Sequence, residues 1–303
     1  MATLHNNVVP SSGVDTSILW GGDRGVFGGA YDNTTIDYIT ISSTGNATDF
    51  GDMTSGRQGY GACSNGTRGV FGGGRNSSVA KHDTIDYITI SSTGNATDFG
   101  NLTLTRTHLA ACSNGTRGLF GGGESTDAYP NENSNRIDYI TISSTGNATD
   151  FGDLTSGRRY LASCSSETRG VWAGGNSNSG NGPITDYVTI ASAGNATNFG
   201  DMPVSCFTNT ACSSAERGLI TRGGYDSIYY ITIATTGSAA TFGNRVFSGK
   251  SGAAASNGER AVFTGGVGED INIDYVTIAT TGNCTDFGDL TLGRTRVSGT
   301  SGD

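Results

Sequence analysis

The sequence predicts an all-β protein built from six consecutive units of four antiparallel strands. Two observations lead to this fold class: one stretch is repeated along the chain, and the residues within it alternate as strands require. The stretch begins Ile-Asp-Tyr-Ile-Thr-Ile and ends Asp-Phe-Gly. It occurs at Ile36–Gly51 and is repeated without change at Ile85–Gly100 and Ile137–Gly152. Looser copies occupy Thr185–Gly200, Ile228–Gly243 and Ile273–Gly288.

The spacing of fixed residues shows which part of each unit varies. Three residues mark every unit. The first is the Arg that begins Arg-Gly-Val-Phe-Gly-Gly or a variant of it, the second is an Asp before Tyr, and the third is a Phe before Gly. In one unit Tyr229 replaces the Asp. The distance from Asp to Phe is 13 residues in all six units, and from Phe to the next Arg it is 18 residues. The distance from Arg to Asp varies from 12 to 21 residues, so all length variation falls in one segment per unit. The Arg positions that mark the six units are Arg24, Arg68, Arg117, Arg169, Arg217 and Arg260.

The first strand of each unit is short and made of small residues, as in Tyr60–Ser64, Leu109–Ser113 and Leu161–Ser165. The innermost strands of a ring crowd together near its axis, and Gly, Ala, Cys and Ser allow that approach. An Asn-Gly pair follows, for example Asn65-Gly66, and predicts a tight turn into the second strand. The second strand is the Arg-Gly-Val-Phe-Gly-Gly stretch.

The repeated stretch itself predicts the third and fourth strands. In Ile36–Ile41 both sides of the strand carry bulky residues, which indicates a strand covered on both faces. Ser-Thr-Gly-Asn supplies turn residues, and Ala-Thr-Asp-Phe-Gly resumes an extended strand. The recurring Asn-x-Thr is therefore interpreted as a turn Asn and a strand Thr. Four strands in each unit of 43 to 52 residues are typical of a β-propeller blade.

Two segments compete for the first strand of the first unit. Residues Asp15–Asp23 precede Arg24, and the tail Arg294–Asp303 also aligns with a first strand. Because the N-terminal segment is more apolar, we expect it to fill this place, with the tail lying against the first unit and helping to close the ring. Residues 1–14 would then form a short N-terminal arm, and residues 15–303 the six-bladed propeller.

The pattern resembles the kelch family of β-propellers, in which an Arg, a small-residue strand, a Gly-Gly doublet, a Tyr and an aromatic residue follow one another. The kelch Arg corresponds to Arg57, Arg106, Arg158 and Arg294. The doublet corresponds to Gly73-Gly74, Gly122-Gly123, Gly174-Gly175 and Gly265-Gly266. This chain departs from the family in that Phe replaces the usual Trp, Asp precedes the Tyr, and Cys206 occupies one Arg position. The resemblance implies a six-bladed, kelch-like propeller with four antiparallel strands per blade.

Composition excludes some classes of function. The net charge is −9, which disfavours a nucleic-acid binder because such proteins need a basic surface. No apolar run is long enough to span a bilayer, so we expect no membrane insertion. The first ten residues lack the basic start and apolar core of a secretory signal, and we expect synthesis in a cytoplasm.

Catalytic and metal-binding patterns are not found in the sequence. The three histidines (His5, His82 and His108) are scattered, and the six cysteines form no Cys-x-x-Cys pair. Cysteines at equivalent positions lie a whole unit apart, so disulfides are not expected. The Asp and Arg that recur in nearly every unit are expected to be structural, with the Asp capping a loop or pairing with a repeat Arg. We therefore expect no enzymatic activity, no cofactor and no metal.

The variable segments between the second and third strands are the candidate binding loops. In a kelch-like ring they emerge on one face, and a fixed scaffold with variable loops is how many binding proteins are built. The alternative is that these loops vary only because little constrains them. Tyr would stack on a polar ligand, and Asn would hydrogen-bond to it. The candidate ligand-binding residues are Tyr31, Arg75, His82, Tyr129, Asn131, Asn133, Asn176, Asn178 and Tyr225.

The repeated Gly-Asn-Ala-Thr-Asp-Phe-Gly-Asp is similar to repeats in virion proteins of tailed bacteriophages, notably those that infect marine cyanobacteria. This resemblance implies a non-enzymatic virion structural protein in a tail, fibre or other surface appendage. Its partners would be other virion proteins and a glycan or protein of the host surface. Two alternatives stay open: a purely structural adaptor that joins virion proteins, and an enzyme that acts on polysaccharide.

Overall fold

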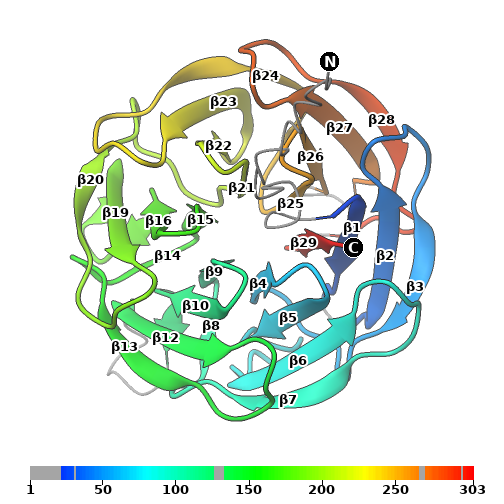
Figure 1. Ribbon diagram of the computed structural model, residues 1–303, viewed down its shortest axis with the longest axis horizontal. Helices are drawn as coiled ribbons and strands as arrows, with labels where there is room; N and C mark the ends of the chain where they lie inside the picture. Colours follow the sequence, from blue (N-terminus) through cyan, green and yellow to red (C-terminus); the bar gives the residue numbers. More distant parts are fainter. Residues whose placement is uncertain (1–21, 31, 126–132, 266–269, 295) are drawn as a thin grey trace, which may run out of the picture.

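The computed structural model describes residues 22–30, 32–125, 133–265, 270–294 and 296–303. The described chain is all-β, and every strand pair in it is antiparallel. Figure 1 shows the sheets arranged around a common axis, a β-propeller-like arrangement. The described part of the chain has no helix with the length and apolar character needed to cross a membrane.

Six four-stranded sheets make up this arrangement, and their strands follow one another from axis to rim. The first consists of β29 (Ser298–Gly302), β1 (Arg24–Gly28), β2 (Thr35–Thr40) and β3 (Thr48–Asp52). The second consists of β4 (Gly61–Ser64), β5 (Arg68–Gly72), β6 (Thr84–Thr89) and β7 (Thr97–Asn101). The third consists of β9 (Ala110–Ser113), β10 (Arg117–Gly121), β12 (Arg136–Thr141) and β13 (Thr149–Asp153).

The other three sheets have the same order of strands. The fourth consists of β15 (Ala162–Ser165), β16 (Arg169–Ala173), β19 (Ile184–Thr189) and β20 (Thr197–Asp201). The fifth consists of β21 (Ala211–Ser213), β22 (Arg217–Thr221), β23 (Tyr225–Thr232) and β24 (Ala240–Gly249). The sixth consists of β25 (Ala253–Ser256), β26 (Arg260–Thr264), β27 (Asn272–Thr277) and β28 (Thr285–Asp289). Two smaller sheets are formed by β8 (Arg106–Thr107) with β11 (Glu124–Ser125), and by β14 (Arg158–Arg159) with β17 (Asn176–Ser177) and β18 (Gly180–Asn181).

The C-terminal strand, and not the N-terminal segment, is the inner strand of the first sheet. β29 pairs with β1 over its whole length, from Gly302 opposite Arg24 to Ser298 opposite Gly28. Our expectation for Asp15–Asp23 was therefore wrong, because apolar character is not what the inner position requires. A Cβ at Gly299 would lie 2.7 Å from the carbonyl oxygen of Ala254, and one at Gly302 would lie 2.1 Å from that of Gly66, so this strand needs small residues. The Ser-Gly-Thr-Ser-Gly sequence of β29 meets that need.

Six serine hydroxyls form a ring of hydrogen bonds around the axis, near the ends of the inner strands. Each hydroxyl donates to the backbone carbonyl of the equivalent serine in the preceding sheet, with donor–acceptor distances from 2.6 to 3.0 Å. The bond from Ser64 to Ser301 joins the second sheet to β29. The order of donation is Ser301, Ser256, Ser213, Ser165, Ser113, Ser64 and again Ser301.

The turn of each repeated stretch packs on the outer strand of the preceding sheet. In the second sheet, the backbone N–H of Gly94 donates to the carbonyl of Phe50 at 2.8 Å, and Asn95 Oδ1 accepts from the N–H of Asp52 at 3.0 Å. Gly51 has φ of 144°, and a Cβ there would lie 2.5 Å from the carbonyl oxygen of Gly94. Residues of the stretch therefore make contacts both within their own sheet and with a neighbouring sheet. This double role accounts for the strict repetition of the stretch.

The Arg that marks each unit is structural. The Arg24 guanidinium lies 4.7 Å from the ring centroid of Tyr38, and its Nη1 donates to the carbonyl of Ile90 in the next sheet at 2.9 Å. Tyr38 in turn meets Phe50 edge to face, with centroids 6.0 Å apart. The same stack is present in the other five sheets.

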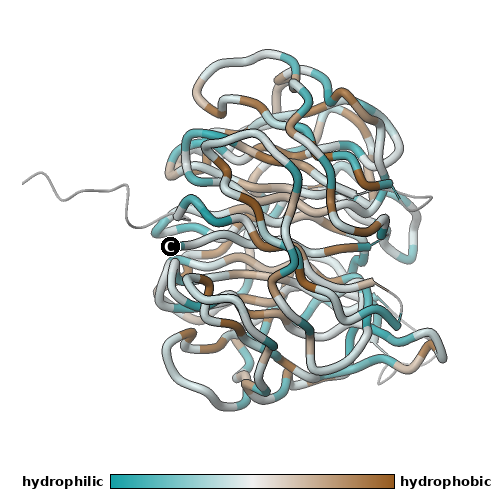
Figure 2. Tube along the Cα trace, turned by 90° about the vertical axis from the view of Figure 1, so that its right-hand side faces the viewer, coloured by the Kyte–Doolittle hydropathy of each residue, from teal (hydrophilic) through white to brown (hydrophobic). Residues whose placement is uncertain are grey.

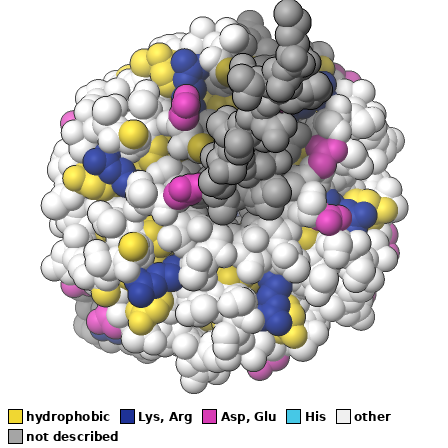
Figure 3. All heavy atoms as spheres, in the orientation of Figure 1, with side chains coloured by type: hydrophobic (Ala, Val, Ile, Leu, Met, Phe, Trp, Pro, Cys, Tyr) yellow, Lys and Arg dark blue, Asp and Glu magenta, His cyan; other side chains and the backbone are white. Residues whose placement is uncertain are grey.

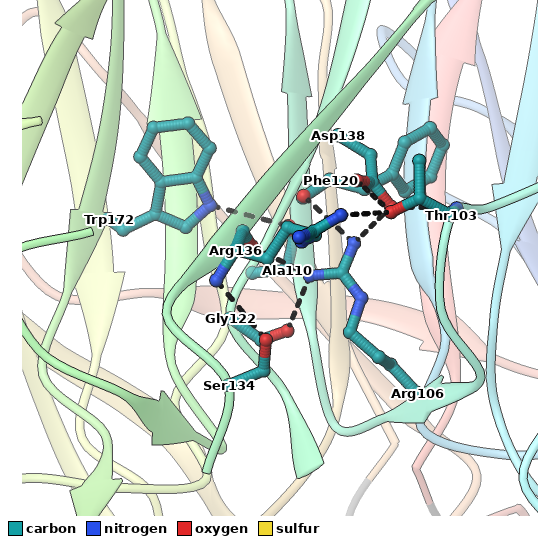
Figure 4. A network of polar contacts seen from close by, with 9 residues as sticks. All are labelled: Thr103, Arg106, Ala110, Phe120, Gly122, Ser134, Arg136, Asp138 and Trp172. Carbon is teal, nitrogen blue, oxygen red and sulfur yellow. Dashed lines mark hydrogen bonds and ion pairs between the residues drawn. The ribbon is translucent and has the colours of Figure 1, made fainter. Parts of the chain in front are cut away.

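A second set of arginines forms buried ion pairs with the recurring Asp, as the sequence predicted. Figure 4 shows Arg106, whose Nη2 lies 2.6 Å from Oδ2 of Asp138, while Nη1 donates to the carbonyls of Gly122 and Arg136. Thr103 Oγ1 also donates to Asp138, at 2.6 Å. Equivalent ion pairs are Arg57–Asp86, Arg158–Asp186 and Arg294–Asp37.

The two departures from this pattern occur together in the fifth sheet. Tyr229 stands in place of the Asp and Cys206 in place of the Arg, and both belong to one hydrophobic cluster. An apolar pair thus replaces an ion pair. In the sixth sheet Arg245 pairs with Asp274 at 3.0 Å, although it comes three residues after Phe242 and not seven.

Candidate functional site

The variable segments of the third and fourth sheets return to the start of the inner strands and form the two smaller sheets there. Glu124 pairs with Thr107, and Asn176 pairs with Arg159. Arg75 forms an equivalent bridge with Gln58. The C-terminus follows β29 directly and lies on the left-hand side in Figure 2. The inner strands therefore end on that side of the molecule and start on the other side. The variable segments therefore lie on one face, which we call the loop face, around the entrance of the axial channel.

One residue per sheet lines this entrance in a left-handed backbone conformation. The φ angles are 68° at Gly59 and between 56° and 58° at the five others. These side chains differ completely, although the strands that follow them are nearly alike. The six residues, which we call the entrance ring, are Gly59, His108, Tyr160, Thr208, Ser251 and Arg296.

Backbone hydrogen bonds connect neighbours in the entrance ring. The N–H of His108 donates to the carbonyl of Gly59 at 2.5 Å, and that of Tyr160 donates to the carbonyl of His108 at 2.9 Å. Thr208 and Ser251 continue the same pattern at 2.9 and 3.1 Å. The left-handed conformation points the backbone N–H of these residues toward the carbonyl of the neighbouring ring residue. The variable side chains are thus carried by a hydrogen-bonded ring of backbone.

The entrance ring encloses a pocket of about 110 Å³ at the mouth of the channel. Its wall contains His108 and Tyr160, whose rings stack with centroids 4.1 Å apart, and Arg296. Hydroxyl groups of Thr208, Ser251 and other residues complete the wall. The pocket thus combines aromatic, basic and hydroxyl side chains.

His108 is a buried polar residue of the pocket wall. Its side chain is 4% exposed, and neither ring nitrogen has a hydrogen-bond partner among the described residues. Burial and four nearby cations lower the pKa of His108 to about 2. The cations, in decreasing order of effect, are Arg296, Arg75, Arg159 and Lys81.

A carboxylate bridges two of these cations. Lys81 Nζ lies 3.0 Å from Oε1 of Glu124, and Arg159 Nη1 contacts Oε2. Burial alone would raise the pKa of Glu124, but the hydrogen bonds from Lys81 and Arg159 outweigh burial and lower it. Among the described residues, Glu124 thus pairs with two of the four cations that act on His108.

The structure brings some of the predicted loop residues together. Asn133 Nδ2 donates to Asn178 Oδ1 at 3.0 Å, which links the segments of the third and fourth sheets. Asn176 bonds within its own hairpin, to Asn181 at 2.8 Å. Arg75 belongs to the cations around His108, and His82 lies in the same segment, half-buried.

The other predicted residues lie apart or are not described. Tyr225 is 52% exposed and lies under the Arg222 guanidinium, 3.7 Å from its ring centroid. Tyr31, Tyr129 and Asn131 lie outside the described residues. The sequence prediction missed the entrance ring, although one signal was present: unlike residues directly precede otherwise similar first strands at these positions.

The opposite face has a different character. Figure 3 shows basic side chains at intervals around this face, beside hydrophobic ones. The contacts that repeat there are the Arg–Tyr stacks, which are the same in all six sheets. Variation is gathered on the loop face and repetition on the opposite one.

The six cysteines are buried, and each has a free thiol. Burial raises the pKa of the Cys63 thiol to about 12, so it is a poor nucleophile at neutral pH. The described residues contain no group of three or more His, Cys, Asp or Glu side chains placed to hold a metal ion. No protein-family model and no curated protein matched the sequence in comparisons with known proteins.

Proposed function

We propose that this chain is a non-enzymatic virion protein of a tailed phage, and that its loop face binds a glycan or protein of the host surface. In this proposal the six sheets are the blades of a six-bladed, kelch-like propeller. The observation that carries the binding function is the segregation of variation: segment lengths and entrance-ring side chains vary on one face of an otherwise repetitive molecule. Repeated support with variable side chains favours recognition over catalysis.

The opposite face suits attachment to the particle. Its repeated Arg–Tyr stacks offer nearly equivalent contacts in each sheet. This observation also favours the second candidate, a structural adaptor that contacts virion proteins on both faces. The two functions differ in what the loop face touches: host surface in the first, a neighbouring virion protein in the second.

Shortening one variable segment tests the first function. Glu124 already pairs with Asn133, so residues 126–132 can be replaced by Asn-Gly without altering β11 or β12. We expect the variant to keep the thermal stability of the original protein and to bind less to cyanobacterial cells and to a glycan array. Thr116→Lys, an exposed change in an Asn-Gly turn of the opposite face, is the matched control and should bind normally.

Two results would overturn the receptor-binding function. Equal binding by the shortened variant would show that the segment takes no part. An original protein that binds neither cells nor glycans, yet co-purifies with other virion proteins through the loop face, would establish the adaptor instead.

A further inference from the structure

A single carboxylate joins the bases of three variable segments. Glu124 begins the segment of the third sheet, and its Oε1 lies 3.0 Å from Nζ of Lys81, which belongs to the segment of the second sheet. Its Oε2 contacts Nη1 of Arg159, whose backbone pairs with Asn176 in the segment of the fourth sheet. We call this contact of Lys81, Glu124 and Arg159 the clasp. The clasp connects the second, third and fourth sheets on the loop face.

The clasp is largely shielded from water. The side chains of Lys81 and Glu124 are 3% and 11% exposed, so salt screens their attraction less than it would at an open surface. Removal of the carboxylate would leave two neighbouring cations, which is costly when charges are partly buried. Asn133 Nδ2 donates to Asn178 Oδ1 at 3.0 Å and adds a second contact between the segments of the third and fourth sheets. The three segments are therefore held as one unit.

The surface that these three segments present is uncharged. Among their described residues the charged side chains are half-buried or buried, and every exposed residue is neutral. Six of the eight exposed residues carry an amide or a hydroxyl group, which can both donate and accept hydrogen bonds. The eight residues are Ser77, Ser78, Val79, Ala80, Asn135, Asn178, Ser179 and Asn181.

The segments of the fifth and sixth sheets present a different surface. Their described, exposed residues are Tyr225, Asp226 and Ile271, so that part of the loop face is apolar and acidic. Sugar hydroxyls are neutral groups that donate and accept hydrogen bonds, and amide and hydroxyl side chains match them in both respects. The second to fourth sheets therefore offer the better surface for a neutral sugar.

We propose that the described residues of these three segments form one composite surface for a neutral polysaccharide chain, and that Glu124 is its positioning residue. A chain that crosses three sheets gains contacts from all three segments only while the clasp holds them in place. The clasp reduces the ordering that binding would otherwise require, and preorganisation of this kind increases affinity. This inference rests on the proposed function, because it names the ligand class and the part of the loop face that binds it.

Surface plasmon resonance of the full chain tests the ligand class, with polysaccharide from cyanobacterial cell envelopes separated into a neutral and an acidic fraction. We expect the neutral fraction to bind. The acidic fraction, and the monosaccharides released from the neutral one, should bind at least about tenfold more weakly. Asn135→Ala should weaken binding of the neutral fraction about fivefold, since it removes hydrogen bonds to the ligand. Asn198→Ala, the same change at an exposed position of β20, should leave binding unchanged.

Glu124→Gln tests the positioning role, because it removes the charge and keeps the size of the side chain. Binding of the neutral fraction should weaken on the order of tenfold. In the free variant, backbone hydrogen–deuterium exchange should become faster around Lys81 and Asn176, in the sheets on either side, while the Asn-Gly turns of the opposite face keep their exchange rates. Glu216→Gln, the matched change at an exposed turn of the opposite face, should alter neither binding nor exchange.

Several outcomes would overturn the inference. These are preferential binding of the acidic fraction, equal binding of chain and monosaccharides, absence of any binding by folded protein, and a Glu124→Gln variant with unchanged binding and exchange. The inference and the proposed function fail separately. Cell binding that is lost on shortening residues 126–132 and on protease treatment of the cells, without polysaccharide binding, would keep the function and reject the ligand class. Binding of the neutral fraction without any cell binding would do the reverse.

Discussion

The entrance ring places strained residues where the side chains vary most. Five side chains other than glycine hold φ between 56° and 58°, a conformation that costs roughly 1–2 kcal/mol for an L-residue. The connecting backbone hydrogen bonds compensate for this cost. Strain that is kept at the same position of five sheets, beside a pocket, is typical of a functional site.

This strain predicts opposite effects for two substitutions. Ser251→Gly should raise the free energy of unfolding by about 0.5 kcal/mol, because relief of the left-handed strain exceeds the added entropy of the unfolded chain. Gly59→Ala should lower it by about 2 kcal/mol, since it adds strain and a Cβ 2.8 Å from Cδ2 of His108. Urea unfolding measures both. A destabilised Ser251→Gly variant would contradict the assignment of strain.

His108 predicts how stability depends on pH. Its pKa is about 2 in the folded protein and near 6.5 when unfolded, so the unfolded state binds a proton first as the pH falls. The stability that comes from keeping this ring neutral is complete above pH 6.5 and decreases as the pH falls toward 2. Between pH 7 and 4.5 this residue should cost on the order of 2 kcal/mol.

The variant His108→Asn isolates this contribution, because Asn tolerates positive φ and does not titrate. The difference in unfolding free energy between the original protein and this variant should change by that amount between pH 7 and 4.5. His82, whose pKa burial also lowers, is present in both proteins and cancels. A difference that does not vary with pH would rule out a buried, neutral His108.

At the scale of single elements, the buried Arg–Asp pairs connect the entry of each inner strand to the third strand. Arg106 and Asp138 are fully buried, and Arg106 also bonds to the carbonyls of Phe120 and Gly122. In the fifth sheet Cys206 and Tyr229 occupy the positions of the Arg and the Asp. A well-packed apolar pair is thus an adequate replacement for the buried ion pair.

This comparison predicts a coupled effect of two substitutions. Asp138→Asn should lower the free energy of unfolding by about 3–5 kcal/mol, because Arg106 keeps a buried charge without its counter-ion. The double variant Arg106→Cys with Asp138→Tyr, which reproduces the fifth sheet, should lose clearly less stability than the sum of the losses in Arg106→Cys alone and Asp138→Tyr alone. Thermal and urea unfolding of the original protein, these two single variants and the double variant give the coupling energy, and strictly additive losses would contradict this account.

The sequence predicted the elements well, for a physical reason. Strands, Asn-Gly turns and the Arg–Asp pairing follow from local patterns that are repeated almost unchanged, as in Asn65, whose Oδ1 accepts from the N–H of Arg68 at 2.7 Å. Arg245 escaped prediction because β24 extends to Gly249 and offers its Arg earlier in the strand. The entrance ring escaped because a left-handed His or Tyr has no sequence signature comparable to that of Gly.

At the scale of the whole molecule, β29 joins the last part of the chain to the first sheet. Ser301 completes the ring of serine hydroxyls, and Ser298 donates to the carbonyl of Tyr60. The sequence left two candidates for this place, and apolar character favoured the wrong one. Space beside the axis, which only the assembled ring defines, decides in favour of the small residues of β29.

Removal of residues 298–303 should therefore destabilise the entire molecule. Loss of the β29–β1 pairing and of two serine hydroxyl bonds should cost at least about 3 kcal/mol of unfolding free energy. A synthetic peptide of residues 297–303, added to the shortened protein, should restore part of the thermal midpoint. A shortened protein as stable as the original would show that β29 is dispensable.

The proposed separation of faces is tested most directly by backbone hydrogen–deuterium exchange of the full protein, alone and with polysaccharide from cyanobacterial cell envelopes. We predict slower exchange at the entrance ring and in the segments around Arg75, Glu124 and Asn176. The Asn-Gly turns of the opposite face should exchange as before. Protection confined to those turns, with an unchanged loop face, would contradict the assignment of the loop face as the binding surface.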